Sequence, residues 1–369
     1  MANEKTNMAI HEGQICFSLM EFPTMASVLM VVRTAIELRV FDIIADAGPE
    51  AQLSATEIVS YIPTCNPKAA ERLDRMLGLL SASGFLINTS PRQSHDGTRS
   101  ERTYSLSKMS HYLLRNSEGF SIAAAMLFVT SREIFESFYV LKDAVLEEGF
   151  QDYFTKAHAM TLYEYTARYP NFAQIFDEAM ASFSKSSLLD GLFNVYEGLK
   201  DVTELMDVGG GYGTTLQQIL TLNPNIRGIN FDLPQVIDSA PKIPGVEHVA
   251  GDMFRSLPKA ESIVMKTILH NWDDDKCKML LKNCWDALPN NGKLTILEFI
   301  VPEMIENTPE SQLTMSVDIQ MLTLFGTKER TLLEYEGLAK SAGFLGPNDF
   351  PTMHGYHILE FFKTVVERA

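Results

Sequence analysis

Residues 205–213 read L-M-D-V-G-G-G-Y-G, an apolar run that ends in an acid and continues directly into a glycine-rich turn. Glycine at alternate positions, Gly209, Gly211 and Gly213, lets the backbone take positive φ and approach a ligand closely. A dinucleotide fingerprint needs a further glycine or alanine after two spacers, and counted from Gly209 that position holds Thr214. The turn therefore favours a nucleoside without a pyrophosphate, such as S-adenosylmethionine, over NAD.

Two acidic residues follow the next two strand-like stretches. Asp232 comes 21 residues after Gly211, where an acid at the tip of the second strand reaches the ribose hydroxyls. Asp252 follows the third stretch, and Met253 and Phe254 beside it offer an apolar surface for an adenine. Either acid alone is equally well explained as a loop cap. The ends of three neighbouring strands, however, are spaced so that they could all contact one nucleoside. This favours a cofactor site over separate loop caps.

Composition predicts a two-domain enzyme. The chain has 369 residues, of which 46% are hydrophobic, so it is long for a single core but typical of a packed globule. Its formal charge of −16 disfavours nucleic acid and anionic membranes as partners. Sparse cysteines predict reduced thiols, and no apolar segment is long enough to span a bilayer. We therefore expect a cytoplasmic protein.

The pattern over residues 1–120 is that of helices with one β-ribbon. Pro23–Ile44 carries apolar residues at helical spacing, and Ser54–Glu57 is a capping box that starts a short helix. Residues 85–88 and 103–106 are predicted to pair as strands. This is a winged-helix-like pattern, but the region has no basic face of the kind that a nucleic-acid reader presents. A dimerisation domain or a lid module is the better prediction.

Residues 121–369 hold the catalytic domain, in which strands alternate with helices and predict a doubly wound, Rossmann-like parallel sheet in an α/β fold. The apolar run Ser262–Leu269 is typical of a central strand and leads into His270. The strand Lys293–Phe299 carries Glu298 near its end. Ligands bind at the carboxyl ends of such strands, so His270 and Glu298 are expected on the same edge as the glycine loop.

A histidine beside an adenosyl site indicates general-base chemistry. A phenol has a pKa of about 10, like tyrosine, and must lose its proton as it attacks a methyl sulfonium. Glu298 and Glu329 are candidates for orienting the imidazole of His270. The run Asp273–Asp275 suggests a metal, but three acids at a helix start are expected from capping and the helix dipole. We therefore predict a site without a metal.

Five motifs occur in a fixed order: D-V-G-G-G-Y-G, F-D-L-P, P-G-V-E-H-V-A-G-D-M-F, H-N-W-D-D-D-K-C and K-E-R-T. With them the chain resembles, over nearly its full length, plant small-molecule O-methyltransferases of the caffeic acid type. The resemblance implies metal-independent methylation of a phenolic hydroxyl by S-adenosylmethionine. It also implies a homodimer whose N-terminal domain swaps around its partner, and that His270 takes the phenol proton between Glu298 and Glu329.

Matching positions extend both binding sites. Besides Gly209, Asp232, Asp252 and Met253, the cofactor site implied by the resemblance includes Leu233, Lys266, Trp272 near the adenine and Ser184 near the methionine end. The implied apolar wall of the substrate pocket consists of Phe172, Phe176, Met180 and Met321.

Departures from the family concern the substrate. Phe128-Val129 replaces a common Met-Asn pair, Phe183 a histidine, and Gln320 an aliphatic residue. The loop 323–327 is one residue shorter than usual and lacks its asparagine. A polar substrate tail would be left unpaired there, at about 1–3 kcal/mol per group. We therefore expect caffeic acid to be a poor substrate and a flatter phenol to be preferred: a flavonoid, coumarin, stilbene or benzylisoquinoline alkaloid.

Other functions stay open at this point. A methyltransferase acting on nitrogen or on a carboxylate shares the cofactor site, although a free amine needs no strong base such as His270. A cofactor-binding subunit that is active only as a heterodimer is a further alternative: the intact His270, Glu298 and Glu329 disfavour it, but the shortened loop before Lys328 keeps it open.

Overall fold

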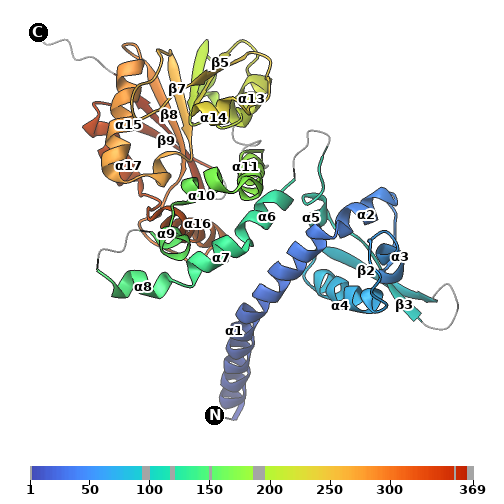
Figure 1. The fold of residues 1–369 in the computed structure, drawn as a ribbon. Helices are drawn as coiled ribbons and strands as arrows, with labels where there is room; N and C mark the ends of the chain where they lie inside the picture. Colours follow the sequence, from blue (N-terminus) through green and yellow to red (C-terminus); the bar gives the residue numbers. More distant parts are fainter. Residues whose placement is uncertain are drawn as a thin grey trace, which may run out of the picture. The chain divides into compact units, whose positions relative to one another are not determined.

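The computed structural model describes residues 2–93, 100–116, 121–148, 152–185, 196–352 and 355–363. The chain divides into two compact units, residues 1–131 and residues 132–369 (Figure 1). None of the helices in the described ranges combines the length and the apolar character that crossing a membrane requires.

The first unit is helical with one small sheet. Its helices are α1 (Ala2–Glu37), α2 (Val40–Asp46), α3 (Ala55–Val59), α4 (Ala69–Ala82), α5 (Lys108–His111) and α6 (Ala123–Val129). Its strands β1 (Leu53–Ser54), β2 (Leu86–Gln93) and β3 (Ser100–Leu106) pair in the order β1-β3-β2. The predicted ribbon is confirmed by the antiparallel pairing of Leu86 with Leu106, and the predicted capping box of Ser54 and Glu57 is formed.

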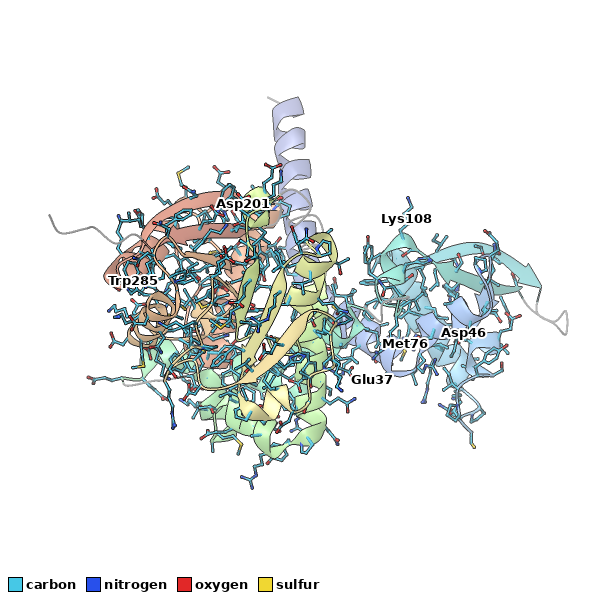
Figure 2. All side chains as sticks on the ribbon, turned by 90° about the horizontal axis from the view of Figure 1, so that it is seen from above. Glu37, Asp46, Met76, Lys108, Asp201 and Trp285 are labelled. Atoms are coloured by element: carbon cyan, nitrogen blue, oxygen red, sulfur yellow. The ribbon has the colours of Figure 1, made fainter. Side chains whose placement is uncertain are left out.

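The predicted helix Pro23–Ile44 is two helices in the structure. Arg39 adopts the left-handed conformation, with φ of 56°, and separates α1, which ends at Glu37, from α2, which ends at Asp46 (Figure 2). The change of direction lets both segments bury apolar residues in one core with α4. That core includes Val32, Val40, Phe41, Ile44, Leu73, Leu77 and Leu80.

The second unit contains a seven-stranded sheet and the helices that cover it. Its helices before the sheet are α7 (Arg132–Phe138), α8 (Leu141–Leu146), α9 (Tyr153–His158), α10 (Leu162–Arg168), α11 (Pro170–Lys185) and the 3-10 turn η1 (Glu197–Leu199). The helices that follow along the chain, between successive strands of the sheet, are α13 (Thr214–Leu222), α14 (Pro234–Ile237), the 3-10 turn η2 (Leu269–Asn271), α15 (Asp274–Ala287), α16 (Pro309–Phe325) and α17 (Leu332–Ser341). The strands are β4 (Glu204–Val208), β5 (Arg227–Asp232), β6 (Val246–Ala250), β7 (Ser262–Lys266), β8 (Lys293–Phe299), β9 (Leu345–Pro351) and β10 (Tyr356–Phe362).

The strands lie in the order β6-β5-β4-β7-β8-β10-β9. The strands β4 to β8 are parallel to one another, as the predicted doubly wound sheet requires. The strands β9 and β10, which the sequence pattern did not reveal, are antiparallel. Only a short connection joins them, and consecutive strands joined in this way cannot be parallel, because a parallel pair needs a long crossover.

Apolar residues alternate between the two faces of the sheet. In β4, Met206 and Val208 pack into a core with α15 and α17, whereas Leu205 packs with η1 and α13 on the opposite face. At the border of the first core, Trp285 of α15 (labelled in Figure 2) packs edge-to-face on Phe344, with ring centroids 5.1 Å apart. Because both faces are covered, the carboxyl ends of the parallel strands are the part of the sheet left for ligands.

Candidate active site

The glycine-rich turn connects β4 to α13. Gly209, Gly211 and Gly213 have φ of 73°, 57° and 81°, a region that side chains other than glycine rarely adopt. A Cβ atom on Gly210 would lie 2.1 Å from Oδ1 of Asn230, whereas one on Gly211 would meet no heavy atom within 4 Å. The backbone at Gly210 is therefore packed against the protein, and at Gly211 it faces open space.

Asp232, at the end of β5, holds this turn directly. Its Oδ2 accepts a hydrogen bond from the backbone N–H of Gly211 at 2.8 Å, and its Oδ1 accepts one from Leu233 at 2.7 Å. Asn230 donates to the carbonyl of Gly211 at 2.8 Å from the same strand. Each carboxylate oxygen of Asp232 keeps a second lone pair, so the residue both shapes the turn and remains able to accept from a ligand.

The third strand end adds a carboxylate and apolar side chains. Asp252 follows β6, and its Oδ1 accepts a hydrogen bond from the backbone N–H of Phe254 at 2.9 Å. The ring of Phe254 packs edge-to-face on Trp272, with centroids 4.7 Å apart. Met253 packs against the same core. The structure thus brings the predicted adenine-binding residues Met253, Phe254 and Trp272 to one edge of the sheet.

Two charged residues at the base of this edge have shifted pKa values. Burial raises the pKa of Asp207, in β4, to about 7. Burial also lowers the pKa of Lys266, the last residue of β7, although the attraction of Asp207 opposes that shift. The two opposite charges attract each other, while Nζ of Lys266, a predicted cofactor residue, donates a hydrogen bond to the hydroxyl of Thr267 at 3.1 Å.

His270 lies in the turn η2 and not directly after a strand. The predicted strand Ser262–Leu269 ends at Lys266, because Thr267 adopts a positive φ of 50° and the chain then forms the 3-10 turn. Two hydrogen bonds hold the start of this turn: Oε1 of Glu298 accepts from the backbone N–H groups of Ile268 and Leu269, at 3.0 and 2.8 Å. The side chain of Glu298 is fully buried at the end of β8.

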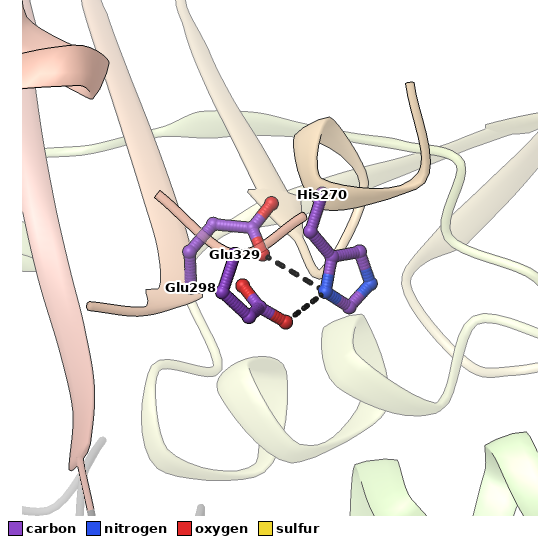
Figure 3. Close-up of side chains that lie close together, drawn as sticks. All are labelled: His270, Glu298 and Glu329. Atoms are coloured by element: carbon purple, nitrogen blue, oxygen red, sulfur yellow. Dashed lines mark hydrogen bonds and ion pairs between the residues drawn. The ribbon is translucent and has the colours of Figure 1, made fainter. Parts of the chain in front are cut away.

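His270 and two glutamates form a compact buried group (Figure 3). Nδ1 of His270 lies 2.6 Å from Oε1 of Glu329 and 3.7 Å from Oε2 of Glu298. A carboxylate only accepts hydrogen bonds, so the ring proton is on Nδ1, and this N–H group donates a hydrogen bond to Glu329. Nε2 points away from both carboxylates (Figure 3) and holds the free lone pair. The imidazole is therefore held as a base.

The environment of His270 changes its proton affinity. Burial alone would lower the pKa of the imidazole, but the negative charges of Glu329 and Glu298 and the hydrogen bond to Glu329 outweigh burial, and the net shift is upward. Burial raises the pKa of the Glu298 carboxyl above its ordinary value. The histidine is thus a stronger base than a solvated one.

Acids near this group have two different roles. Asp273, the first of the three consecutive aspartates, is the N-cap of α15 and accepts from the backbone N–H of Lys276 at 2.9 Å, which confirms the capping interpretation. His270, Glu298 and Glu329, in contrast, bring one potential ligand atom each to within 4.8 Å of one another. Among the described residues, the acids and histidine that cluster closely enough to be weighed as metal ligands are therefore at His270 and not in the aspartate run.

A stripe of apolar residues on α11 contains four of the predicted pocket residues. Phe172 is buried, and Met180 and Phe183 are partly exposed. Phe176 contacts Tyr163 of α10 edge-to-face, with ring centroids 6.4 Å apart. The side chain of Ser184, on the same helix, lies outside the described residues.

Tyr163 contacts two groups of predicted site residues, although the sequence gave no reason to select it. Its ring stacks on Trp272 at 6.1 Å, with planes 15° apart, and lies 5.5 Å from the ring of Phe325 at the end of α16. It therefore joins the predicted adenine side to the predicted pocket wall. Its partners are far away in the sequence, so no local pattern marks it.

The remaining predicted pocket residues lie in different surroundings. Met321 of α16 is buried, whereas its neighbour Gln320 lines an open cavity of about 580 Å³ together with Phe138 and Met315. Phe128 is buried in α6 of the first unit, and its role stays a prediction.

A parallel sheet with a glycine-rich turn at its carboxyl edge is the fold expected of an S-adenosylmethionine-dependent methyltransferase, and the match to the O-methyltransferase family model and to its curated relatives identifies the chain as one. It belongs to the O-methyltransferase family, because residues 138–345 match the O-methyltransferase domain and residues 20–116 match the O-methyltransferase dimerisation domain.

Curated plant relatives match almost the whole chain. The (S)-scoulerine 9-O-methyltransferase of Coptis japonica is 44% identical over 97% of this chain and 92% of its own length. A caffeic acid 3-O-methyltransferase of Catharanthus roseus is 43% identical over 98% of each chain. The flavonoid 3'-O-methyltransferase of Chrysosplenium americanum is 44% identical over 92% of this chain and 97% of its own length.

Solved structures share the fold. Human N-acetylserotonin methyltransferase in complex with S-adenosylmethionine superposes with a TM-score of 0.83 over 95% of this chain and 98% of its own, at 22% identity. CalO1, a methyltransferase of calicheamicin biosynthesis with bound S-adenosylhomocysteine, has a TM-score of 0.77 over 95% and 98%, at 23% identity.

Proposed function

We propose that this enzyme transfers the methyl group of S-adenosylmethionine to a phenolic hydroxyl of an aromatic plant metabolite, with His270 as the general base. The observation that carries the proposal is the 2.6 Å contact of Nδ1 of His270 with Glu329, which leaves Nε2 free to accept a proton. The plant relatives named above are O-methyltransferases of (S)-scoulerine, caffeic acid and a flavonoid.

The two glutamates support this base in different ways. Glu329 accepts a hydrogen bond from the N–H group at Nδ1, and its negative charge stabilises the imidazolium that forms when Nε2 takes the phenol proton. Glu298 holds the turn that carries His270 through two backbone N–H groups. A positioned base of this kind contributes about 10²- to 10⁴-fold in rate, which is enough to distinguish it from a spectator.

The residues at the glycine-rich edge fit a nucleoside with a free ribose diol. Gly211 faces open space, and the carboxylates of Asp232 and Asp252 lie at neighbouring strand ends. S-adenosylmethionine supplies an electrophilic methyl group on a positively charged sulfur. We infer that it is held by Gly209, Gly211, Asp232, Leu233, Asp252, Met253, Phe254, Lys266, Trp272 and Ser184.

We infer further that the reaction needs no metal. Ligand atoms that share one ion each lie about 2.0–2.2 Å from it, which keeps neighbouring ligand atoms about 3 Å apart. The 2.6 Å separation of Nδ1 and Oε1 is instead the length of a charge-assisted hydrogen bond. A proton between His270 and Glu329 thus accounts for the geometry.

The aromatic residues support a flat acceptor. Tyr163, Phe176 and Phe325 form a continuous set of ring contacts that reaches Trp272. We propose that the acceptor lies between these rings and the other predicted pocket residues of the second unit, Phe172, Met180, Phe183, Gln320 and Met321. A flavonoid, coumarin, stilbene or benzylisoquinoline alkaloid fits such a wall better than caffeic acid.

The family match gives this chain a dimerisation domain. We propose a cytoplasmic homodimer in which residues 1–120 swap around the partner, while residues 121–369 form the catalytic domain. The dimer is tested by measuring the molecular mass in solution of the full-length protein and of a variant that lacks residues 1–120. The full-length protein should be a dimer and the variant a monomer.

Transfer of labelled methyl to a panel of plant phenols, with and without EDTA, tests the reaction. His270→Ala should lower transfer by about 10²- to 10⁴-fold while S-adenosylhomocysteine still binds, and EDTA should change nothing. His357→Ala is the matched control, because His357 of β10 also pairs with an acid, Asp349 of the edge strand β9, at 2.7 Å.

Three outcomes would contradict the proposal. Full activity of the His270→Ala variant would show that His270 is not the general base. Loss of transfer in EDTA would show that the reaction needs a metal. Transfer to amines alone, or only after a second subunit is added, favours the N-methyltransferase or the heterodimer.

A further inference from the structure

Arg330 is the largest fully buried side chain in the described part of the protein. It follows Glu329 directly, yet the hydrogen bonds of its guanidinium go to Leu269, Trp272 and Asp274 and not to either glutamate. A buried charge is costly unless it is paired and hydrogen-bonded. The partners of Arg330 therefore indicate why the fold retains it.

Those partners are the two carbonyls that flank His270. Nη1 of Arg330 donates to the carbonyl of Leu269 at 2.9 Å, and Nη2 donates to the carbonyl of Trp272 at 2.7 Å. The forked guanidinium thus grips the turn η2 on both sides of the histidine. The thiol of Cys277 donates to the same two carbonyls, at 3.3 and 3.5 Å.

The same guanidinium is anchored on the far side. Nε and Nη2 both donate to Oδ1 of Asp274, at 3.1 and 2.8 Å. The backbone of Arg330 is fixed as well, because its carbonyl accepts from Val301, which follows β8, at 3.0 Å. Five rigidly arranged donors make arginine the residue that can hold several acceptors at once.

The loop of Glu329 is held in a similar way. Its backbone N–H donates to Oδ1 of Asp318 on α16 at 2.8 Å. Arg330 is the next residue, so its side chain ties the loop that carries Glu329 to the turn that carries His270. One side chain thereby spans the two segments whose separation sets the 2.6 Å contact between Nδ1 and Oε1.

We propose that Arg330 is a positioning residue that fixes His270 against Glu329 by holding both the turn η2 and the loop of Glu329. The inference rests on the proposed function, since it explains how the general base is kept in place. A displacement of about 1 Å at a reacting group costs about 10²-fold in rate. Lysine at 330 keeps the charge but loses the fork, so Arg330→Lys should lower kcat by about that factor.

The decisive measurement compares two acceptors. An ordinary catechol needs a base, whereas a nitro-substituted catechol that is already ionised at the assay pH does not. Arg330→Lys should lower kcat for the first by about 10²-fold and for the second by less than about threefold, with the affinity for S-adenosylhomocysteine unchanged. A merely structural defect would lower both rates and the affinity together.

A pH profile gives a second readout. The charged groups that act on His270 are Glu329, Glu298 and Lys266, and Arg330→Lys alters none of them chemically. If the variant separates His270 from Glu329, the acidic limb of kcat for the ordinary catechol moves to lower pH. An acidic limb that stays in place, with kcat unchanged, overturns the proposal.

Two further variants complete the test. Lys328→Gln is the control: it removes a cation from the same loop, where Lys328 pairs with Glu334 at the surface, and should match the wild type. Asp274→Asn weakens the anchor of Arg330 at a half-exposed residue and should lower kcat about two- to fivefold, again only for the ordinary catechol. It carries the test if Arg330→Lys does not fold.

The outcomes separate this inference from the proposed function. If His270→Ala loses transfer to the ordinary catechol while Arg330→Lys and Asp274→Asn behave like the wild type, the positioning role is wrong and the base stands. If His270→Ala keeps full activity with the ordinary catechol, the proposed function itself fails, and the positioning role fails with it.

Discussion

Nδ1 of His270 lies 2.6 Å from Oε1 of Glu329, in a buried environment where a hydrogen bond to a carboxylate is stronger than in water. The second glutamate, Glu298, is 3.7 Å from the same nitrogen and gives its closer contacts to backbone amides. The two carboxylates are therefore not equivalent: Glu329 orients the imidazole, and Glu298 mainly shapes the turn.

Replacing Glu329 with glutamine should change the pH dependence of the reaction. The pKa of His270 is raised in the folded enzyme, and Glu329 contributes to that rise. Activity of a base increases as the pH rises through its pKa, so the acidic limb of kcat/KM should lie above the ordinary value of about 6.5. Glu329→Gln removes the charge, and the limb should move to lower pH while the plateau rate falls.

Rate profiles of the two enzymes from about pH 5 to 9 check this expectation, around the histidine pKa. Glu336→Gln is the control, since Glu336 pairs with Lys340 on the surface of α17. An unmoved limb in Glu329→Gln would show that another group titrates.

Glu298 should contribute to the stability of the fold mainly through its hydrogen bonds to two backbone N–H groups, and less through its negative charge. Glutamine at 298 keeps an oxygen for the N–H groups of Ile268 and Leu269, whereas alanine leaves two backbone donors unpaired in a buried turn, at about 1–3 kcal/mol each. Glu298→Ala should therefore lose about 2–6 kcal/mol of unfolding free energy, and Glu298→Gln much less. Denaturant titration measures both, and equal losses in the two variants would refute the anchoring role.

Much of the site was predictable because its polar residues follow the ends of parallel strands, and these ends lie at one edge of the sheet. Parallel strands end on the same side of a sheet, so Gly211, Asp232 and Asp252 are brought together by strand order alone. The exact position of His270 was not predictable, because the apolar pattern continues through Leu269 although β7 ends at Lys266. The positive φ of Thr267 and the capping by Glu298 override the periodicity.

Residues that act through distant contacts were beyond the sequence pattern. Arg330 stands in a quoted motif, but its partners Leu269 and Trp272 are backbone carbonyls, which no side-chain pattern reports. Tyr163 likewise meets Trp272 only in the folded chain. The strands β9 and β10 were missed for a related reason: they lie after the alternating pattern has ended, and β10 pairs with β8 on one side and with β9 on the other.

Alanine substitutions in the glycine turn should separate stability from cofactor binding. At Gly210 a Cβ meets Asn230 and Asp207 at 2.1 and 2.8 Å, so Gly210→Ala should unfold at lower denaturant. At Gly211 nothing lies within 4 Å, and the positive φ costs alanine only about 1–2 kcal/mol. Gly211→Ala should fold yet bind S-adenosylhomocysteine more weakly, because its Cβ enters the space where we place the ligand.

Calorimetric titration with S-adenosylhomocysteine and denaturant unfolding of both variants test this pair. Gly337→Ala, at a helical glycine with no atom within 4 Å of the added Cβ, is the control for a substitution without strain or clash. Unchanged affinity in Gly211→Ala would remove Gly211 from the cofactor site.

Phe325 should determine which phenols the enzyme prefers. Its ring lies 5.5 Å from that of Tyr163, which in turn stacks on Trp272, so a flat acceptor gains aromatic contacts worth about 0.5–1.5 kcal/mol each. Phe325→Asn removes one ring and offers a hydrogen-bonding amide instead. The ratio of kcat/KM for an aromatic polycycle to that for caffeic acid should fall by about tenfold, the equivalent of about 1.4 kcal/mol.

Phe350→Leu removes an aromatic residue of β9 that contacts Tyr196, away from the ring set, and should leave the ratio unchanged. Competition between a flavonoid and caffeic acid in one reaction measures the ratio without separate concentrations. A wild-type enzyme that methylates caffeic acid faster than every polycycle tested would show that these rings pack the core and do not select the acceptor, because the free energy of stacking would then have no effect on kcat/KM.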